Sequence, residues 1–86
     1  KEPRHAVLEA DKLLDFVLKK RGYEGTLGEK LKKAGREFSS IDDVWSAHKL
    51  RNRVAHEMGF EVSEQEARKA LSAIKQALWD LGAKNL

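Results

Sequence analysis

The stretch "SEQEARKALSAIKQALWDLG", residues 63–82, carries the clearest fold signal in the chain. Ser63 followed three residues later by Glu66 is the capping-box pattern that opens a helix, and Gly82 is a common helix stop. The apolar residues between these ends recur at helical spacing: Ala67, Ala70, Leu71, Ile74, Ala77, Leu78 and Leu81. Such a stripe predicts an amphipathic helix that must bury one face against neighbouring elements.

The N-terminal part of the chain carries the same signals twice. Apolar residues recur at helical spacing from Pro3 to Arg21, and Gly22 follows as a stop. Thr26 and Glu29 form a second capping box, which predicts a short helix from Leu27 to Ala34. Two helices are therefore expected before residue 35.

A long helix is predicted between these two parts, from Ile41 to about Glu57. Ser40 is its expected N-cap and Asp43 lies near the positive end of its dipole. The segment "MGFEV", residues 58–62, breaks it. Four amphipathic helices with short connections predict an all-α fold, an antiparallel four-helix bundle.

Length and composition limit the function classes. The 86 residues make one domain, 1–86. A domain this small buries only about 60% of its unfolded surface, so we expect a homodimer, formed through the third helix. The chain has no Cys, which suits a reducing compartment, and no apolar run near the ~20 residues that span a bilayer. The start "KEPRHAVLEA" lacks the apolar core of a signal peptide, and we expect a cytoplasmic protein without a membrane segment.

The charge balance is mildly basic. Lys and Arg number 17 against 14 Asp and Glu, giving +3, and charged residues make up 36% of the chain. This balance permits contact with phosphate without requiring it, and it is equally typical of solvated helix faces.

The third helix has an unusually wide apolar arc of roughly 220°, taken at ~100° per residue. A polar stripe of His48, Asn52 and His56, spaced four residues apart, lies at one margin with Trp45. We expect this stripe to form a dimer seam or a cleft. Arg51 falls inside the arc, where a charge is rare unless paired.

Two expectations follow for Arg51. In a structural role its stem lies over apolar surface and its head reaches an acid, with Asp15, Asp43 or Glu57 as candidates, whereas in a catalytic role its head and that of His56 face one open cleft. It is also five residues from His56, hence ~140° away on a regular helix. The two side chains therefore share a site only if the Arg reaches round or the helix loosens near His56.

The segment "LRNRVAHE", residues 50–57, resembles the HEPN superfamily motif, in which an Arg, often followed by Asn, precedes a His by four to six residues. The small all-α bundle, with the motif late in a long penultimate helix, resembles that family too. The resemblance implies a dimer that brings two motifs into one cleft. Many such domains are metal-independent endoribonucleases of toxin–antitoxin and defence systems, and others have lost catalysis and act as binding or scaffold modules.

The residue types fit cleavage of RNA by its own 2′-OH to 2′,3′-cyclic phosphate and 5′-OH ends. The resemblance implies catalytic roles for Arg51, Asn52 and His56. Arg51 would bind the phosphate and His56 would transfer protons, while Asn52 would orient His56 or the phosphate. No cofactor or metal is expected.

Weaker candidates surround this trio, each with a structural alternative. Lys49 and Arg53 would follow the RNA backbone or simply be solvated, and Trp45 would stack on a base or pack in a dimer seam. His48 would join the cleft or bond within the bundle. A zinc site of His48 and His56 is a further alternative, but the stripe offers Asn rather than a third good ligand.

The partners implied are RNA and an antitoxin or nucleotidyltransferase. Some HEPN toxins carry a Tyr two residues after the motif His, where such a transferase modifies them. Met58 stands at that position here, and the only tyrosine, Tyr23, lies in the first loop.

Overall fold

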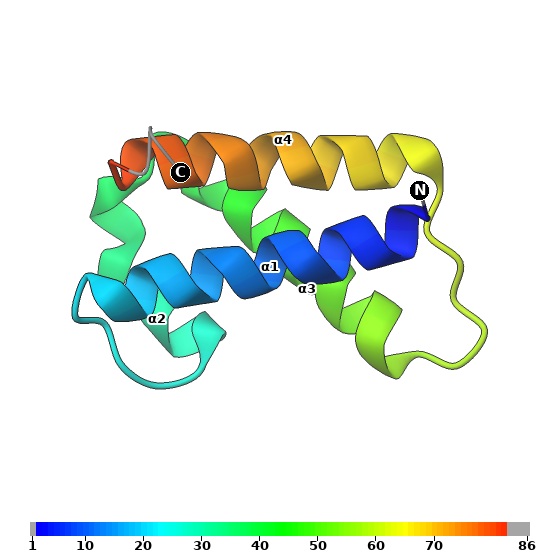
Figure 1. Ribbon diagram of the computed structural model, residues 1–86, viewed down its shortest axis with the longest axis horizontal. Coiled ribbons are helices and arrows are strands. Elements are labelled where there is room, and N and C mark those ends of the chain that lie inside the picture. Colours follow the sequence, from blue (N-terminus) through cyan, green and yellow to red (C-terminus); the bar gives the residue numbers. More distant parts are fainter. Residues whose placement is uncertain (1, 83–86) are drawn as a thin grey trace.

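The computed structural model describes residues 2–82, and over this range the chain is helical with no strand (Figure 1). The prediction of an all-α fold of four packed helices is confirmed. A short 3₁₀ helix, η1, was not predicted. The elements in order are α1 (Pro3–Lys20), α2 (Leu27–Ala34), η1 (Gly35–Glu37), α3 (Ile41–His56) and α4 (Glu64–Asp80).

The three long helices form the body of the molecule. Figure 1 shows α1 and α4 running side by side in the same direction, with α3 running the opposite way behind α1. The short α2 packs against α1 near its C-terminal end. Because α3 touches both α1 and α4, it has a contact edge on each side.

The core lies between these helices and is built from aliphatic side chains. Phe38, just after η1, is 7% exposed and packs into this core. The contribution of α4 is mostly small. Its buried residues are Ala67, Ala70, Ile74 and Ala77. Small side chains let neighbouring helices approach closely but leave space above the seam unfilled.

All three predicted N-cap residues stand at the N-cap positions of their helices, and two of them make side-chain capping bonds. The Thr26 and Ser63 hydroxyls accept the backbone N–H of Glu29 and Glu66, at 3.2 and 3.0 Å, and each glutamate accepts the N–H of its cap residue in return. These backbone bonds hold the pKa of both glutamates below the usual range.

Ser40 occupies the N-cap position of α3, as predicted, but its side chain makes no capping bond. Its ψ of 68° differs from the 160° and 165° of the two working caps. The Ser40 carbonyl instead accepts the Asp43 N–H at 3.1 Å.

The end of α3 also differs slightly from expectation. The helix stops at His56, one residue early. Met58, in the segment predicted to break the helix, lies in the loop and is fully exposed. No helix within residues 2–82 combines the length and apolarity needed to cross a bilayer.

Candidate functional site: a cleft around a buried aspartate

A buried carboxylate, Asp11, lies on the face of α1 that packs against α3. It falls in the apolar stripe of α1, four residues after Val7 and three before Leu14, and only 4% of it is exposed. A buried acid is costly unless charged or hydrogen-bonding partners surround it. Its partners here all come from α3.

Each oxygen of Asp11 faces a different side chain of the third helix. Oδ1 lies 3.3 Å from Nδ1 of His48, and Oδ2 lies 3.4 Å from Nε of Arg51. The Arg51 side chain is 35% exposed and that of His48 is 12% exposed. Nη1 of Arg51 also donates to Oδ1 of Asn52 at 3.0 Å. One buried acid thus fixes a guanidinium and an imidazole side by side.

The acid that pairs with Arg51 is not one of the three expected. Asp15 accepts Nζ of the buried Lys30 at 2.7 Å, and Glu57 pairs with Arg53 at 3.1 Å. Spacing along α3 could suggest acids near it in sequence, but only the packing of α1 on α3 places Asp11 below Arg51. Asp11 is a site residue that the sequence reading missed.

The bond from Asp11 sets the chemistry of the His48 ring. A carboxylate only accepts hydrogen bonds, so Nδ1 carries the hydrogen in this pair and Nε2 is left for other partners. A methyl group placed on Gly28, in the first turn of α2, would lie 4.0 Å from Nε2 and 3.8 Å from the Trp45 ring. Nε2 therefore points toward the start of α2.

These residues line an open cleft of about 640 Å³ between α1, the start of α2 and α3. Of the predicted site residues, Arg51, Asn52 and His48 line it together. His5 of α1, exposed and not predicted as a site residue, lines it as well. Among the charged residues along its walls the acids outnumber the cations: Glu9, Asp11 and Asp15 against Lys12 and Arg51.

Trp45 packs within its own chain beside this cleft. Its ring meets the His48 ring edge-on, with centroids 6.1 Å apart and planes at 63°, and it lies against Gly28. The side chain is half-buried. Trp45 therefore packs within one chain, against α2 and His48. Whether it also lies in a dimer seam stays a prediction.

The remaining predicted residues lie outside the cleft. His56 is exposed at the last position of α3. Lys49 and Arg53 line a groove on the opposite side of the helix, between α3 and α4. Arg53 also holds Glu57 and stacks on the Phe60 ring, with its guanidinium 4.0 Å from the ring centroid. The helix stays regular through His56, so Arg51 and His56 remain on different sides, as their spacing implied.

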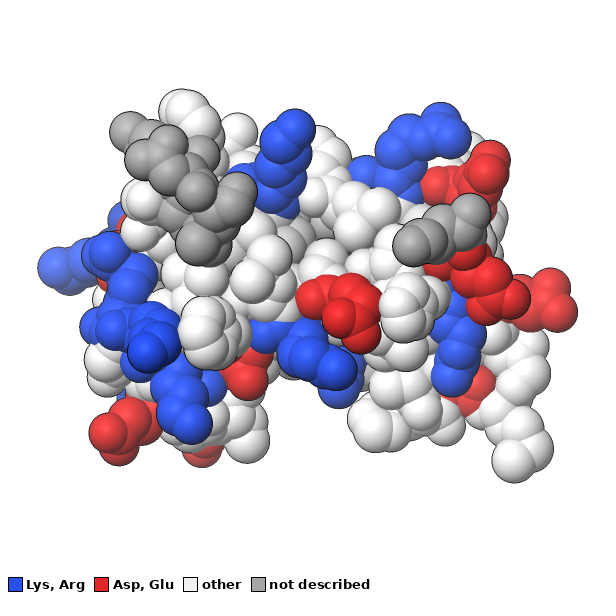
Figure 2. Space-filling model, in the orientation of Figure 1, with Lys and Arg blue, Asp and Glu red and all other residues white. Residues whose placement is uncertain are grey.

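Basic residues gather away from the cleft. Figure 2 shows Lys and Arg side chains clustered over the end of the molecule where α1 finishes, and Lys19 and Lys20 form the last turn of that helix. Any phosphate bound in the cleft would therefore depend on Arg51 more than on a surrounding positive field.

Asp11 had a readable signal in the sequence, because an acid at an apolar position of a helix needs a partner. His5 had none, since only the tertiary packing brings it to the cleft. Within residues 2–82 no three His, Cys, Asp or Glu side chains are grouped so as to hold a metal ion.

Comparison with known proteins adds no relative. No protein-family model matches the chain, and no curated protein or solved structure matches it. The functional interpretation therefore rests on the cleft and on the resemblance of residues 50–57.

Proposed function

We propose that this domain is a metal-independent endoribonuclease that cleaves RNA in the cleft around Asp11, leaving 2′,3′-cyclic phosphate and 5′-OH ends. One observation carries the proposal. A buried acid orients a guanidinium and an imidazole on the wall of one open cleft. Oriented cationic and proton-transferring groups are what this reaction needs.

The proposed reaction uses the nucleophile that RNA supplies. The 2′-oxygen attacks the adjacent phosphorus, a base takes the 2′-OH proton, and an acid returns a proton to the 5′-oxygen as its bond to phosphorus breaks. Arg51 binds the phosphate through its Nη2 edge, because Nε and Nη1 face Asp11 and Asn52. His48 and His5, which both line the cleft, are the groups best placed for proton transfer.

The motif resemblance gives the proton-transfer role to His56 instead. His56 follows Asn52 by one helical turn, about 6 Å along the axis, and it is exposed. In this version an RNA strand held at Arg51 leaves the cleft along α3 and meets His56, either of the same chain or of a second copy. An antitoxin or nucleotidyltransferase partner belongs to this version of the proposal.

A catalytically silent binding or scaffold module is the second candidate. Two observations favour it: Arg51 already satisfies two of its nitrogens within the protein, and the walls of the cleft carry more acidic than basic side chains, three against two. In that case the polar cluster serves to lock α3 onto α1.

The test is an RNA cleavage assay in EDTA with wild type and with Arg51→Ala, His48→Ala, His5→Ala and His56→Ala, each checked for helicity by circular dichroism. We expect cyclic-phosphate products from wild type and their loss in Arg51→Ala. Loss in His48→Ala or His5→Ala, with His56→Ala active, assigns proton transfer to the cleft. The reverse pattern assigns it to the motif histidine.

Two results would overturn the nuclease proposal. Absence of cleavage on any RNA by folded wild type would favour the binding module. Cleavage that survives Arg51→Ala would place the reaction elsewhere or in a contaminant.

A further inference from the structure

A second concave surface runs along the opposite edge of α3, and no residue of the cleft takes part in it. This groove, of about 800 Å³, lies between α3 and α4. Its middle is lined by small side chains from both helices: Ser46 and Ala47 on α3, Ser72 and Ala73 on α4. Small residues at the centre of a helical face allow another helix to approach closely.

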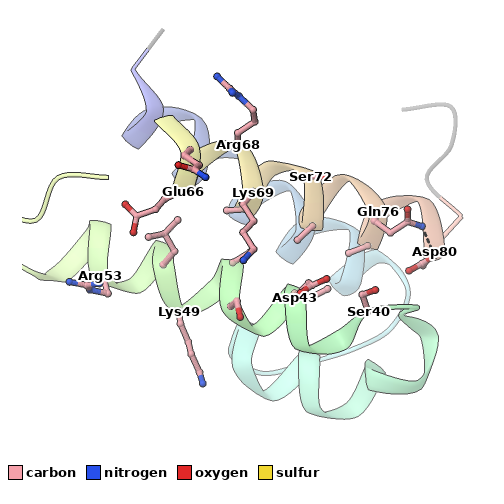
Figure 3. Close-up of a pocket in the computed structure, with 18 residues that line it drawn as sticks. Ser40, Asp43, Lys49, Arg53, Glu66, Arg68, Lys69, Ser72, Gln76 and Asp80 are labelled. Carbon is pink, nitrogen blue, oxygen red and sulfur yellow. Dashed lines mark hydrogen bonds between the residues drawn. The ribbon is translucent and has the colours of Figure 1, made fainter. Parts of the chain in front are cut away.

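The charges along this groove are sorted by position. At the end where α4 begins, three lining charges are held within the chain: Arg53 pairs with Glu57, Arg68 pairs with Glu64, and Glu66 bonds to Ser63 in the cap of α4. Of the other four charges, Asp43 and Asp80 lie toward one end, where α3 begins and α4 finishes, and Lys49 and Lys69 lie toward the other. Asp43 and Lys49 each stand three residues from Ser46, on opposite sides of it. Figure 3 shows Lys69 extending from α4 toward α3, whereas Lys49 points away from α4.

Three of these four charges are available to a partner. Asp43, Lys49 and Lys69 have no salt bridge or side-chain hydrogen bond with any residue of the described range 2–82. Asp80 accepts hydrogen bonds from Ser39 and Gln76, and the backbone N–H of Ser39 is the main reason that its pKa lies below the usual range. The groove thus presents a negative end and a positive end.

We propose that a second copy of this chain covers the groove, related by a two-fold axis that crosses the groove at Ser46 and Ala73. A surface that is negative at one end and positive at the other complements itself when turned end for end. With this axis, Asp43 of one copy faces Lys49 of the other, and the Asp80 end faces the Lys69 end.

The charge pattern disfavours the other two-fold arrangement that could pack this face against a second copy of itself. A two-fold axis running along the groove would set α3 of one copy over α4 of the other, with the same ends together. Asp43 would then meet the Asp80 end of the second copy, and Lys49 would meet the Lys69 end. Juxtaposed like charges disfavour that arrangement.

The proposed dimer differs from one formed through the predicted stripe of Trp45, His48, Asn52 and His56. The groove and the cleft share no lining residue, so both clefts stay open in this dimer. The face is only two helices wide, each of about 25 Å, which is small for a stable interface. We therefore expect weak, salt-sensitive association.

Sedimentation equilibrium from micromolar to millimolar protein, at low and high salt, tests the proposal. We expect wild type to dimerise at low salt and to weaken at high salt. Asp43→Lys and Lys49→Asp should each raise the dimer Kd about tenfold, because each change occurs twice in the dimer. The double variant Asp43→Lys/Lys49→Asp should recover most of that loss.

The matched control is Lys75→Asp, which makes the same change of charge on an exposed lysine of α4 outside the groove. It should associate like wild type. The proposal is overturned by a wild type that stays monomeric throughout, by a control as weak as Lys49→Asp, or by a double variant no better than the single ones. Single variants with the dimer Kd of wild type would mean that the interface lies on another face, and they too would overturn the proposal.

Discussion

The two edges of α3 differ in where their polar and charged side chains lie. On the α1 side, polar side chains are drawn into the protein, and Asp11, His48 and Arg51 satisfy one another at 3.3–3.4 Å. On the α4 side, the floor is made of small residues and the charges stand at the rim, facing solvent. The α1 edge thus buries polar groups that pair with one another, whereas the α4 edge has a floor of small side chains and charges that face solvent at its rim.

The two edges therefore differ in their effect on the free energy of unfolding. Desolvating Asp11 is unfavourable, and only its two partners offset that cost. Rim charges such as Lys49 keep their water and cost almost nothing. Substitutions in the cleft should therefore change the free energy of unfolding, whereas substitutions at the groove rim should change association and leave folding nearly unaltered.

The largest effect is expected from Asp11→Ala. It leaves the Arg51 guanidinium and the His48 ring without their shared acceptor, and we expect the free energy of unfolding to fall by about 1–3 kcal/mol. This loss of stability is smaller than for a fully buried ion pair, because about one-third of the Arg51 side chain is exposed to water. Urea denaturation followed by tryptophan fluorescence measures it.

Glu9→Ala is the matched control for that experiment. Glu9 lines the same cleft from the same helix, but its pairing with Lys12, at 3.6 Å, is between exposed groups. It should change stability by less than about 0.5 kcal/mol. Equal losses in both variants would mean that Asp11 is not the anchor of the α1–α3 edge.

A smaller effect should separate the starts of α3 and α4. The Ser63 hydroxyl caps α4, so Ser63→Ala should cost about 1 kcal/mol. Ser40, at the negative end of the groove, makes no capping bond, so Ser40→Ala should be nearly neutral. Both variants make the same Ser→Ala change at the N-cap position of a helix, and thermal or urea denaturation compares them directly. A loss at Ser40 equal to that at Ser63 would show that the Ser40 hydroxyl does cap α3 in solution.

Local signals predicted the helices well and the site only in part. Capping boxes and stripes act within one turn or one helix, so Thr26 and Ser63 could be read from the sequence. The side chain brought to Arg51 depends instead on how α1 packs on α3. The sequence offered Asp15, Asp43 and Glu57 as candidates and could not single out Asp11; Asp15 is bound to Lys30 and Glu57 to Arg53. The angular separation of Arg51 and His56 was predictable, because it depends on helix geometry alone.

The smallest effect concerns Asp80 and its dependence on pH. Its pKa lies below the ordinary value of 3.8 because the Ser39 N–H, and then the Ser39 hydroxyl and Gln76, donate to the carboxylate. A depressed folded pKa stabilises the protein above the unfolded pKa, and this contribution is lost as the pH falls through the folded value. Asp80→Asn should therefore lower the free energy of unfolding by about 0.5 kcal/mol at neutral pH, a small loss because water screens the group.

That loss should shrink when the pH drops below about 4, because wild type then gives up the same charge. Urea titrations at neutral and acidic pH, at protein concentrations that keep the chain monomeric, measure the difference. Glu61→Gln, an exposed acid in the loop between α3 and α4, controls for the change in net charge. A deficit in Asp80→Asn that persists unchanged in acid would mean that the protonated carboxyl ties the loop at Ser39 to α4 as well as the carboxylate does. Asp80 would still be charged at neutral pH, so such a result would remove the pH dependence of stability and leave the negative end of the groove unchanged.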